Sequence, residues 1–70
     1  MMPLMLASLG KEVVVNKVGG NAEVRQHLNE LGFNVGSPVT VVSSVNGNLI
    51  VKVKESRVAL DKSLAAKIMV

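Results

Sequence analysis

Two stretches in which aliphatic residues alternate with polar ones flank an Asn46-Gly47 pair, and this pattern constrains the fold more than any other feature of the chain. Alternation with a period of two is typical of a strand that buries one face, and Asn-Gly between two such strands predicts a β-hairpin. The residues that alternate inward are Val39, Val41, Leu49, Val51 and Val53. We therefore expect the core to form around one hairpin.

The register of this hairpin depends on which side chains are buried together. A two-residue loop places Val41 opposite Lys52, which mixes core positions with solvent positions. A three-residue loop with a left-handed glycine places Val41 opposite Val51 and leaves the lysines outside. We therefore predict a three-residue loop from Val45 to Gly47.

A short amphipathic helix is predicted before the hairpin. Asn21 suits the N-cap, and Glu23 suits the first helical turn. An apolar stripe follows at helical spacing, formed by Val24, Leu28 and Leu31. Gly32 suits the left-handed position that ends a helix, and Phe33 is then expected to fold back onto Leu28.

Further short strands are predicted on both sides of these elements. A β-branched run from Val13 to Val18 forms the first strand and ends at Gly19. Arg57 to Leu60 forms another strand, Asp61 caps a helical turn, and Lys67 to Val70 forms the last strand. Short strands in a chain of this length are expected to curl into a small closed barrel, which removes exposed edges. We therefore predict a mainly β fold, a small barrel of about five strands with one inserted α-helix and a short C-terminal helical turn.

Length and composition exclude several classes of function. The chain has 70 residues, which predicts a single domain over 1–70 with no room for a deep catalytic cavity, so we do not expect an enzyme. There is no Cys, which excludes disulfides, thiolate zinc sites and cysteine nucleophiles. Phe33 is the only aromatic residue, so nucleic-acid binding by base stacking is not expected. No apolar run is long enough to insert into a membrane and no export signal is visible, so we expect a cytoplasmic protein.

One side of the predicted helix carries candidate metal ligands. Glu23, His27 and Glu30 are spaced four and three residues apart, and His27 is the only imidazole in the chain. Carboxylates and imidazole are ligands for hard and borderline divalent cations. Charged residues at helical spacing more often form a solvated surface, and no residue is seen that would fix the orientation of these ligands. A metal ion bound here would therefore be held weakly.

The outer face of the predicted barrel carries a candidate partner-binding surface. Its basic residues are Lys52, Lys54 and Arg57. The net charge of +3 favours acidic surfaces or phosphates as partners, although lysines on strands also simply prevent edge-to-edge aggregation. Val42 and Ile50 form an apolar pair on the same face, which something should cover in a monomer. We expect the N-terminal segment from Pro3 to Leu9 to cover this pair, with a partner protein as the alternative.

Short motifs along the chain occur in a specific order and spacing. They are Leu9-Gly10, Gly19-Gly20, Arg25 with Leu28, Glu30-Leu31-Gly32-Phe33 with Gly36, Arg57-Val58-Ala59-Leu60, Ala65 and Ile68-Met69-Val70. Together these motifs cover nearly the whole chain. In their order and spacing, the chain resembles the FeoA family of small accessory proteins of bacterial and archaeal ferrous iron uptake. The resemblance implies an SH3-like barrel with a helix inserted after the first strand, in agreement with the architecture predicted above.

The resemblance also implies a partner and an alternative function. The expected partner is the cytosolic GTPase domain of a FeoB-type ferrous iron transporter, which would hold the protein at the inner face of the cell membrane. The alternative is a metal-sensing domain related to the C-terminal domain of metal-dependent repressors, in which the candidate ligands bind Fe²⁺ or another divalent transition metal ion. No cofactor is required for either role, and homodimer formation stays open.

Two loop residues depart from the family pattern. Val35 stands where the family often has proline, which gives the turn before Gly36 more backbone freedom. Glu55 stands where a glycine often precedes the Arg57 strand. Either the backbone at Glu55 does not need a positive φ, or the loop differs from that of the family.

Overall fold

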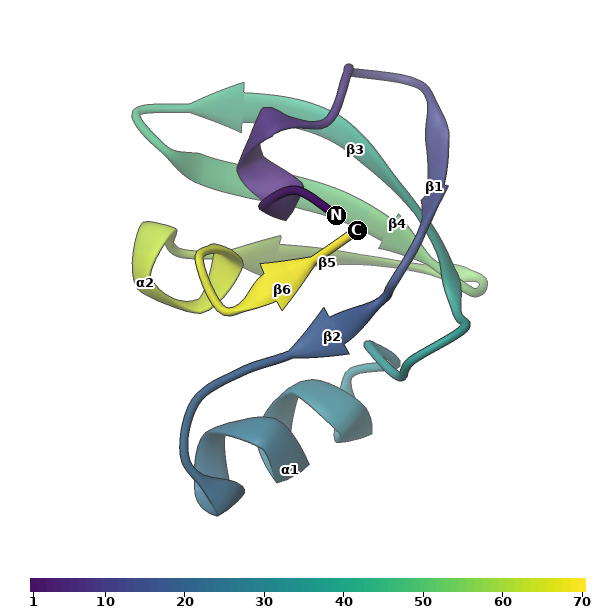
Figure 1. Ribbon diagram of the computed structural model, residues 1–70. Coiled ribbons are helices and arrows are strands. Elements are labelled where there is room, and N and C mark those ends of the chain that lie inside the picture. Colours follow the sequence, from purple (N-terminus) through teal and green to yellow (C-terminus); the bar gives the residue numbers. More distant parts are fainter.

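The computed structural model describes residues 1–70 and contains two antiparallel sheets (Figure 1). The four-stranded sheet has the order β1-β3-β4-β5, with β1 at Glu12–Val14, β3 at Pro38–Val45, β4 at Asn48–Val53 and β5 at Ser56–Leu60. The two-stranded sheet pairs β2 at Lys17–Val18 with β6 at Ile68–Met69. The helices are η1 at Leu4–Leu6, α1 at Ala22–Glu30 and α2 at Lys62–Ala65. The predicted mainly β fold with one inserted helix and a C-terminal helical turn is confirmed, with six strands in place of about five.

The predicted first strand is divided between the two sheets. β1 pairs with β3, whereas β2 pairs with β6. Between them, the Val15 amide donates to the Ser37 carbonyl at 3.0 Å and the Asn16 amide donates to the Met69 carbonyl at 2.8 Å. The backbone therefore changes partner at these two residues and carries the chain from one sheet to the other. Figure 1 shows this segment bending in front of the four-stranded sheet, which helps to close the barrel.

The loop of the β3–β4 hairpin is shorter than predicted. Val45 pairs with Asn48, so the loop contains only Asn46 and Gly47. Both residues have positive φ, 53° and 83°, as a type I′ turn requires. The predicted three-residue loop is therefore wrong, because asparagine accepts a positive φ more readily than most residues and lets the turn close with two residues.

A β-bulge nevertheless produces the predicted core register. Val41 pairs with Val51 and Ser43 pairs with Ile50, so Val42 is an extra residue in β3. The bulge supplies the one-residue shift that the predicted three-residue loop would have supplied. The five predicted inward residues of the hairpin are consequently all buried, and Lys52, the lysine of β4, lies outside.

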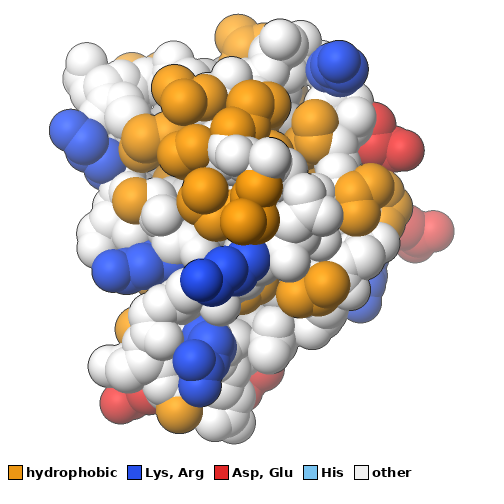
Figure 2. All heavy atoms as spheres, in the orientation of Figure 1, with side chains coloured by type: hydrophobic (Ala, Val, Ile, Leu, Met, Phe, Trp, Pro, Cys, Tyr) orange, Lys and Arg blue, Asp and Glu red, His pale blue; other side chains and the backbone are white.

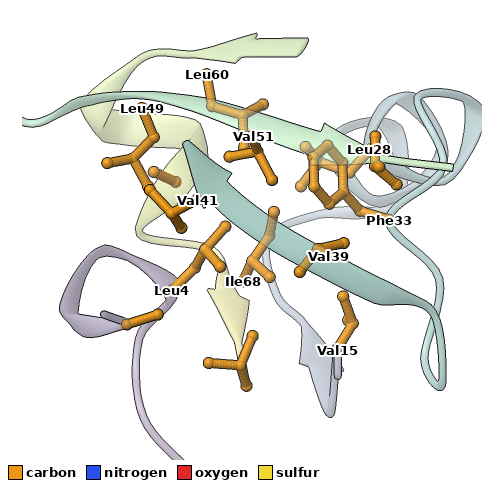
Figure 3. Packing of buried hydrophobic residues seen from close by; sticks show 14 residues of the cluster. Leu4, Val15, Leu28, Phe33, Val39, Val41, Leu49, Val51, Leu60 and Ile68 are labelled. Carbon is orange, nitrogen blue, oxygen red and sulfur yellow. The ribbon is translucent and has the colours of Figure 1, made fainter. Parts of the chain in front are cut away.

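All parts of the chain contribute to one hydrophobic core (Figure 3). Its residues are Leu4, Ala7, Val15, Leu28, Phe33, Val39, Val41, Leu49, Val51, Val53, Leu60, Ala65, Ile68 and Val70. Figure 3 shows the side chains of the hairpin directed toward Leu4 and Ile68, with Phe33 and Leu28 at one end of the cluster. No polar or charged residue is buried, so the fold is held by apolar packing and backbone hydrogen bonds.

The N-terminal segment enters this core and does not cover the outer apolar pair. Leu4 is fully buried on the inner side of the barrel. Met2 and Val70 exchange two backbone hydrogen bonds of 2.7 Å, which fix the segment beside β6. Val42 and Ile50 each remain 36% exposed on the opposite side of the sheet. The predicted cover is therefore wrong, because burial of Leu4 in the core keeps this segment away from the outer face.

Both ends of α1 match the prediction. The Asn21 side chain accepts a hydrogen bond from the Val24 amide at 2.9 Å. Gly32 has a φ of 108°, and the Phe33 amide donates to the Leu28 carbonyl at 3.0 Å, as in a Schellman motif. Leu28 and Phe33 are both fully buried, so this end of the helix is part of the core.

The elements after the hairpin also match. The Asp61 side chain accepts a hydrogen bond from the Leu64 amide at 2.8 Å and caps α2. The turn between β4 and β5 contains Lys54 and Glu55, because the residues on either side of them are paired. Lys54 has a φ of 55°, whereas Glu55 does not have a positive φ. The first of the two explanations for Glu55 is therefore the correct one.

Replacement of Leu28 by Ala tests the contribution of α1 to the core. We expect the free energy of unfolding to fall by about 2 to 5 kcal/mol, because the substitution leaves a cavity beside Phe33. Urea denaturation of the variant and of the wild type measures the change. Gln26→Ala, at an exposed position of the same helix, is the control and should stay within about 0.5 kcal/mol. Equal effects of the two substitutions would refute this packing.

A pair of glycine variants separates backbone strain from steric crowding. Gly32 and Gly36 both have positive φ, 108° and 92°. A Cβ atom at Gly32 would lie 3.0 Å from Cγ2 of Val53, whereas a Cβ atom at Gly36 would have no neighbour within 4 Å. We expect Gly36→Ala to lower the free energy of unfolding by about 1 kcal/mol through strain alone. Gly32→Ala should cost clearly more in the same denaturation experiment, and equal costs would argue against the contact with Val53.

Candidate functional site

The predicted metal ligands do not gather into a site. Glu23, His27 and Glu30 are all exposed on α1, and no three His, Asp or Glu side chains are grouped so that they could hold a metal ion. Glu23 and Glu30 are separated by about 10 Å along the helix axis. Metal–ligand distances are only about 2.0 to 2.6 Å, so ligands at both ends of this span do not converge on one ion. The three residues therefore do not fit a three-ligand site.

An anaerobic calorimetric titration with Fe²⁺ checks this conclusion. We expect no saturable binding heat from Glu23, His27 and Glu30, which we call the helix face, because these side chains do not converge on one ion. The His27→Ala variant, which removes the only imidazole, should give the same titration as the wild type. A saturable signal that is lost in His27→Ala would show that the helix face binds the ion after all.

Of the three basic residues of the predicted partner surface, the structure places only two directly beside each other. Lys52 in β4 lies directly opposite Arg57 in β5, and both are exposed. Residues directly opposite each other in adjacent strands lie on the same face, and like charges in such a pair repel. Lys54 lies in the turn after β4, and its side chain extends toward Gly32 at the end of α1. The structure therefore forms a close Lys52–Arg57 pair, with Lys54 at the edge of the surface.

The apolar part of this surface is a short stripe across three strands. Ile50 in β4 pairs with Ser43 of β3, next to the bulged Val42, and with Ala59 of β5 on its other side. Ala59 is exposed and was not singled out by the sequence analysis. The period of two along β5 indicates the outward position of Ala59, because its neighbour Leu60 is buried.

We call the outer surface of β3, β4 and β5 the sheet face. It comprises Val42, Ile50, Lys52, Arg57 and Ala59, with Lys54 at its edge in the turn between β4 and β5. It combines an exposed apolar stripe with cations, and it lies on the side of the sheet opposite the core. The molecule contains no pocket, so the sheet face is an open surface. None of the helices is long and apolar enough to cross a membrane.

The fold is a small SH3-like barrel, and its sheet face exposes apolar and basic side chains to solvent. The model of the family described as "FeoA domain" matches residues 2–70 of the chain. A curated relative from Methanocaldococcus jannaschii, named "Putative Fe(2+) transport protein A", is 40% identical over 70 residues, which is 100% of this chain and 85% of the relative. The chain belongs to the FeoA family.

Solved structures support the same assignment. The crystal structure of an iron uptake regulatory protein (FeoA) is 30% identical, has a TM-score of 0.85, and is matched over 96% of this chain and 89% of that one. Stenotrophomonas maltophilia FeoA complexed with zinc, described as a prokaryotic SH3 domain protein, is 31% identical with a TM-score of 0.83, over 99% of this chain and 88% of that one. A manganese-dependent transcriptional repressor has the same fold in part of its chain, with a TM-score of 0.84 and 17% identity over 94% of this chain and 38% of that one.

Proposed function

We propose that the protein is a non-enzymatic accessory protein of ferrous iron uptake that binds the cytosolic GTPase domain of a FeoB-type transporter. Membership of the FeoA family supports the connection with Fe²⁺ transport. In this role the protein acts in the cytoplasm and does not itself move iron. Its function is to change the activity of the transporter by binding to the transporter's cytosolic part.

The observation that carries this proposal is the Lys52–Arg57 pair beside the exposed Val42 and Ile50. Two cations held directly opposite each other weaken the sheet, whereas carboxylates of a partner placed between them would be attracted by both. The neighbouring apolar side chains would be removed from water in the same contact. The sheet face therefore suits a protein surface that carries acidic residues around an apolar spot.

Binding can regulate a GTPase only when it discriminates between conformations. The nucleotide-bound states of such a domain differ in shape, and a partner that binds one state more tightly increases the population of that state. The open sheet face would contact the GTPase domain in this way without a catalytic residue of its own. Whether the transporter is stimulated or inhibited is then set by the state that the sheet face prefers.

Charge reversal on the sheet face tests the proposal. We expect Lys52→Glu/Lys54→Glu/Arg57→Glu to weaken the binding of the purified GTPase domain by about tenfold or more and to flatten its salt dependence. The single variant Lys52→Glu replaces a like-charge pair by an opposite-charge pair, so it should weaken binding without loss of thermal stability. Isothermal titration calorimetry at two salt concentrations measures both effects.

The control for this experiment changes charge elsewhere on the molecule. Lys17→Glu/Lys67→Glu alters the net charge but leaves the sheet face intact, and we expect it to bind the GTPase domain nearly as tightly as the wild type. Unchanged affinity of the Lys52→Glu/Lys54→Glu/Arg57→Glu variant would overturn the proposed surface. Absence of binding by the wild type would overturn the proposed partner.

A metal-sensing domain is the second candidate function. It is supported by the zinc complex of the Stenotrophomonas maltophilia relative and by the fold shared with the repressors. The arrangement of Glu23, His27 and Glu30 does not favour it, because these side chains do not form a three-ligand group. Saturable Fe²⁺ binding in the titration described above would make this function the leading one.

A further inference from the structure

A second exposed surface lies where the two ends of the chain meet. Pro3 and Lys17 both pair with Met69, from opposite sides of β6, so the three residues lie side by side on one face. Lys67 directly precedes β6, and its carbonyl accepts a hydrogen bond from the Gly19 amide at 2.7 Å, which continues the β2–β6 pairing. Ile68 is buried, so Lys67 lies on the same outer face as Met69. We call this surface the terminal face.

Exposed apolar side chains extend the terminal face over η1. Leu6 is 67% exposed and Met1 is 79% exposed. Figure 2 shows a continuous group of hydrophobic side chains over η1 and the chain ends. Exposed apolar groups of this kind mark an interaction site more often than isolated surface residues do.

The charges along the lower border of this apolar group have one sign. In Figure 2, lysine and arginine side chains lie along its lower border, over β2, β6 and α1, and the visible acidic side chains lie at the margins of the view. Lys17 and Lys67 are the basic residues that the β2–β6 pairing places beside Met69. The protein as a whole carries a net charge of +3. The terminal face therefore presents apolar side chains bordered by cations.

We infer that the terminal face binds the surface of a membrane that contains anionic phospholipids. Apolar side chains such as Leu6 and Met69 would reach the boundary between headgroups and acyl chains. The long side chains of Lys17 and Lys67 would keep their ammonium groups at the level of the lipid phosphates. Each kind of group therefore meets the layer of the membrane that suits its chemistry.

Two other occupants fit this surface less well. A second copy of the chain would bring two basic borders together, which like-charge repulsion opposes. A peptide partner is usually held by pockets for its side chains, and the molecule contains no pocket. A lipid surface needs no pocket, because it is fluid and adapts to protruding side chains.

The inference goes beyond the proposed function, because it gives the protein a direct contact with the membrane surface that does not depend on a partner. Figure 1 shows η1 and β6 in front of the four-stranded sheet, with the core between them and that sheet. The terminal face and the sheet face are therefore on opposite sides of the molecule. A membrane and the GTPase domain would contact the protein at the same time without competing for one surface.

Flotation with lipid vesicles tests this inference. The wild type should bind vesicles made of equal parts of phosphatidylcholine and phosphatidylglycerol, and it should bind pure phosphatidylcholine vesicles much less. We expect Leu6→Glu and Lys17→Glu/Lys67→Glu each to reduce the bound fraction about tenfold or more. These side chains are exposed, so thermal unfolding should show that both variants stay folded.

Matched controls separate the terminal face from general charge and hydrophobicity. Lys52→Glu/Lys54→Glu makes the same change in net charge on the opposite side of the molecule. Val35→Glu introduces the same residue at an apolar position that is 71% exposed in the turn before β3. Both controls should bind the anionic vesicles at least half as well as the wild type.

Three outcomes would overturn the inference. They are absence of vesicle binding, equal binding to neutral and anionic vesicles, and equal losses in the controls and the terminal-face variants. If the terminal-face variants bind vesicles as the controls do and instead lose the GTPase domain, the surface binds protein and not lipid. The vesicles contain no protein, so a negative result in flotation leaves the test of the proposed function unaffected.

Discussion

The β-bulge at Val42 sets which side chains of the β3–β4 hairpin face the core. The two-residue turn at Asn46 and Gly47 would by itself place Val41 opposite Lys52, and the extra residue restores the pairing of Val41 with Val51. Val39, Val41, Leu49, Val51 and Val53 then all lie on the inner side of the hairpin. The same bulge leaves Val42 on the outer surface beside Ile50, so one irregularity completes the core and creates the apolar part of the sheet face.

The core also determines how the two candidate surfaces are arranged. Leu4 and Ile68 fill it from the side of the chain ends, and the hairpin fills it from the side of the sheet. The residues between these buried positions must point outward, and they form the terminal face on one side and the sheet face on the other. A small barrel without a pocket can thus offer two independent contact surfaces, because all its inward positions are used for packing.

The helix α1 contributes to the barrel more clearly than to a metal site. Leu28 and Phe33 are fully buried at its C-terminal end, where the left-handed Gly32 folds the chain back onto the core. Its charged side chains point into solvent and do not converge. An accessory protein of iron uptake with this arrangement would act through its contacts with other molecules, while its helix stabilises the barrel that carries those contacts.

Features that depend on near neighbours along the chain can be predicted from the sequence. The caps at Asn21 and Asp61, the glycine that ends α1, the inward alternation around the hairpin and the mainly β class all follow from residues a few positions apart. The outward positions of Lys52 and Arg57 follow from the same alternation. These features are predictable because hydrogen-bonding geometry and strand periodicity are local properties.

Features that need partners far along the chain become visible only in the folded structure. The first strand is divided because its second part pairs with β6, Leu4 is buried near the hydrogen bonds that join Met2 to Val70, and the bulge at Val42 lies in the pairing of β3 with β4. The helix face also could not be judged from spacing, because three candidate ligands on one side of α1 do not necessarily converge on one ion. Local patterns predict which residues are buried. They do not predict which residues contact each other in the core, because those contacts form between segments that are distant in the sequence.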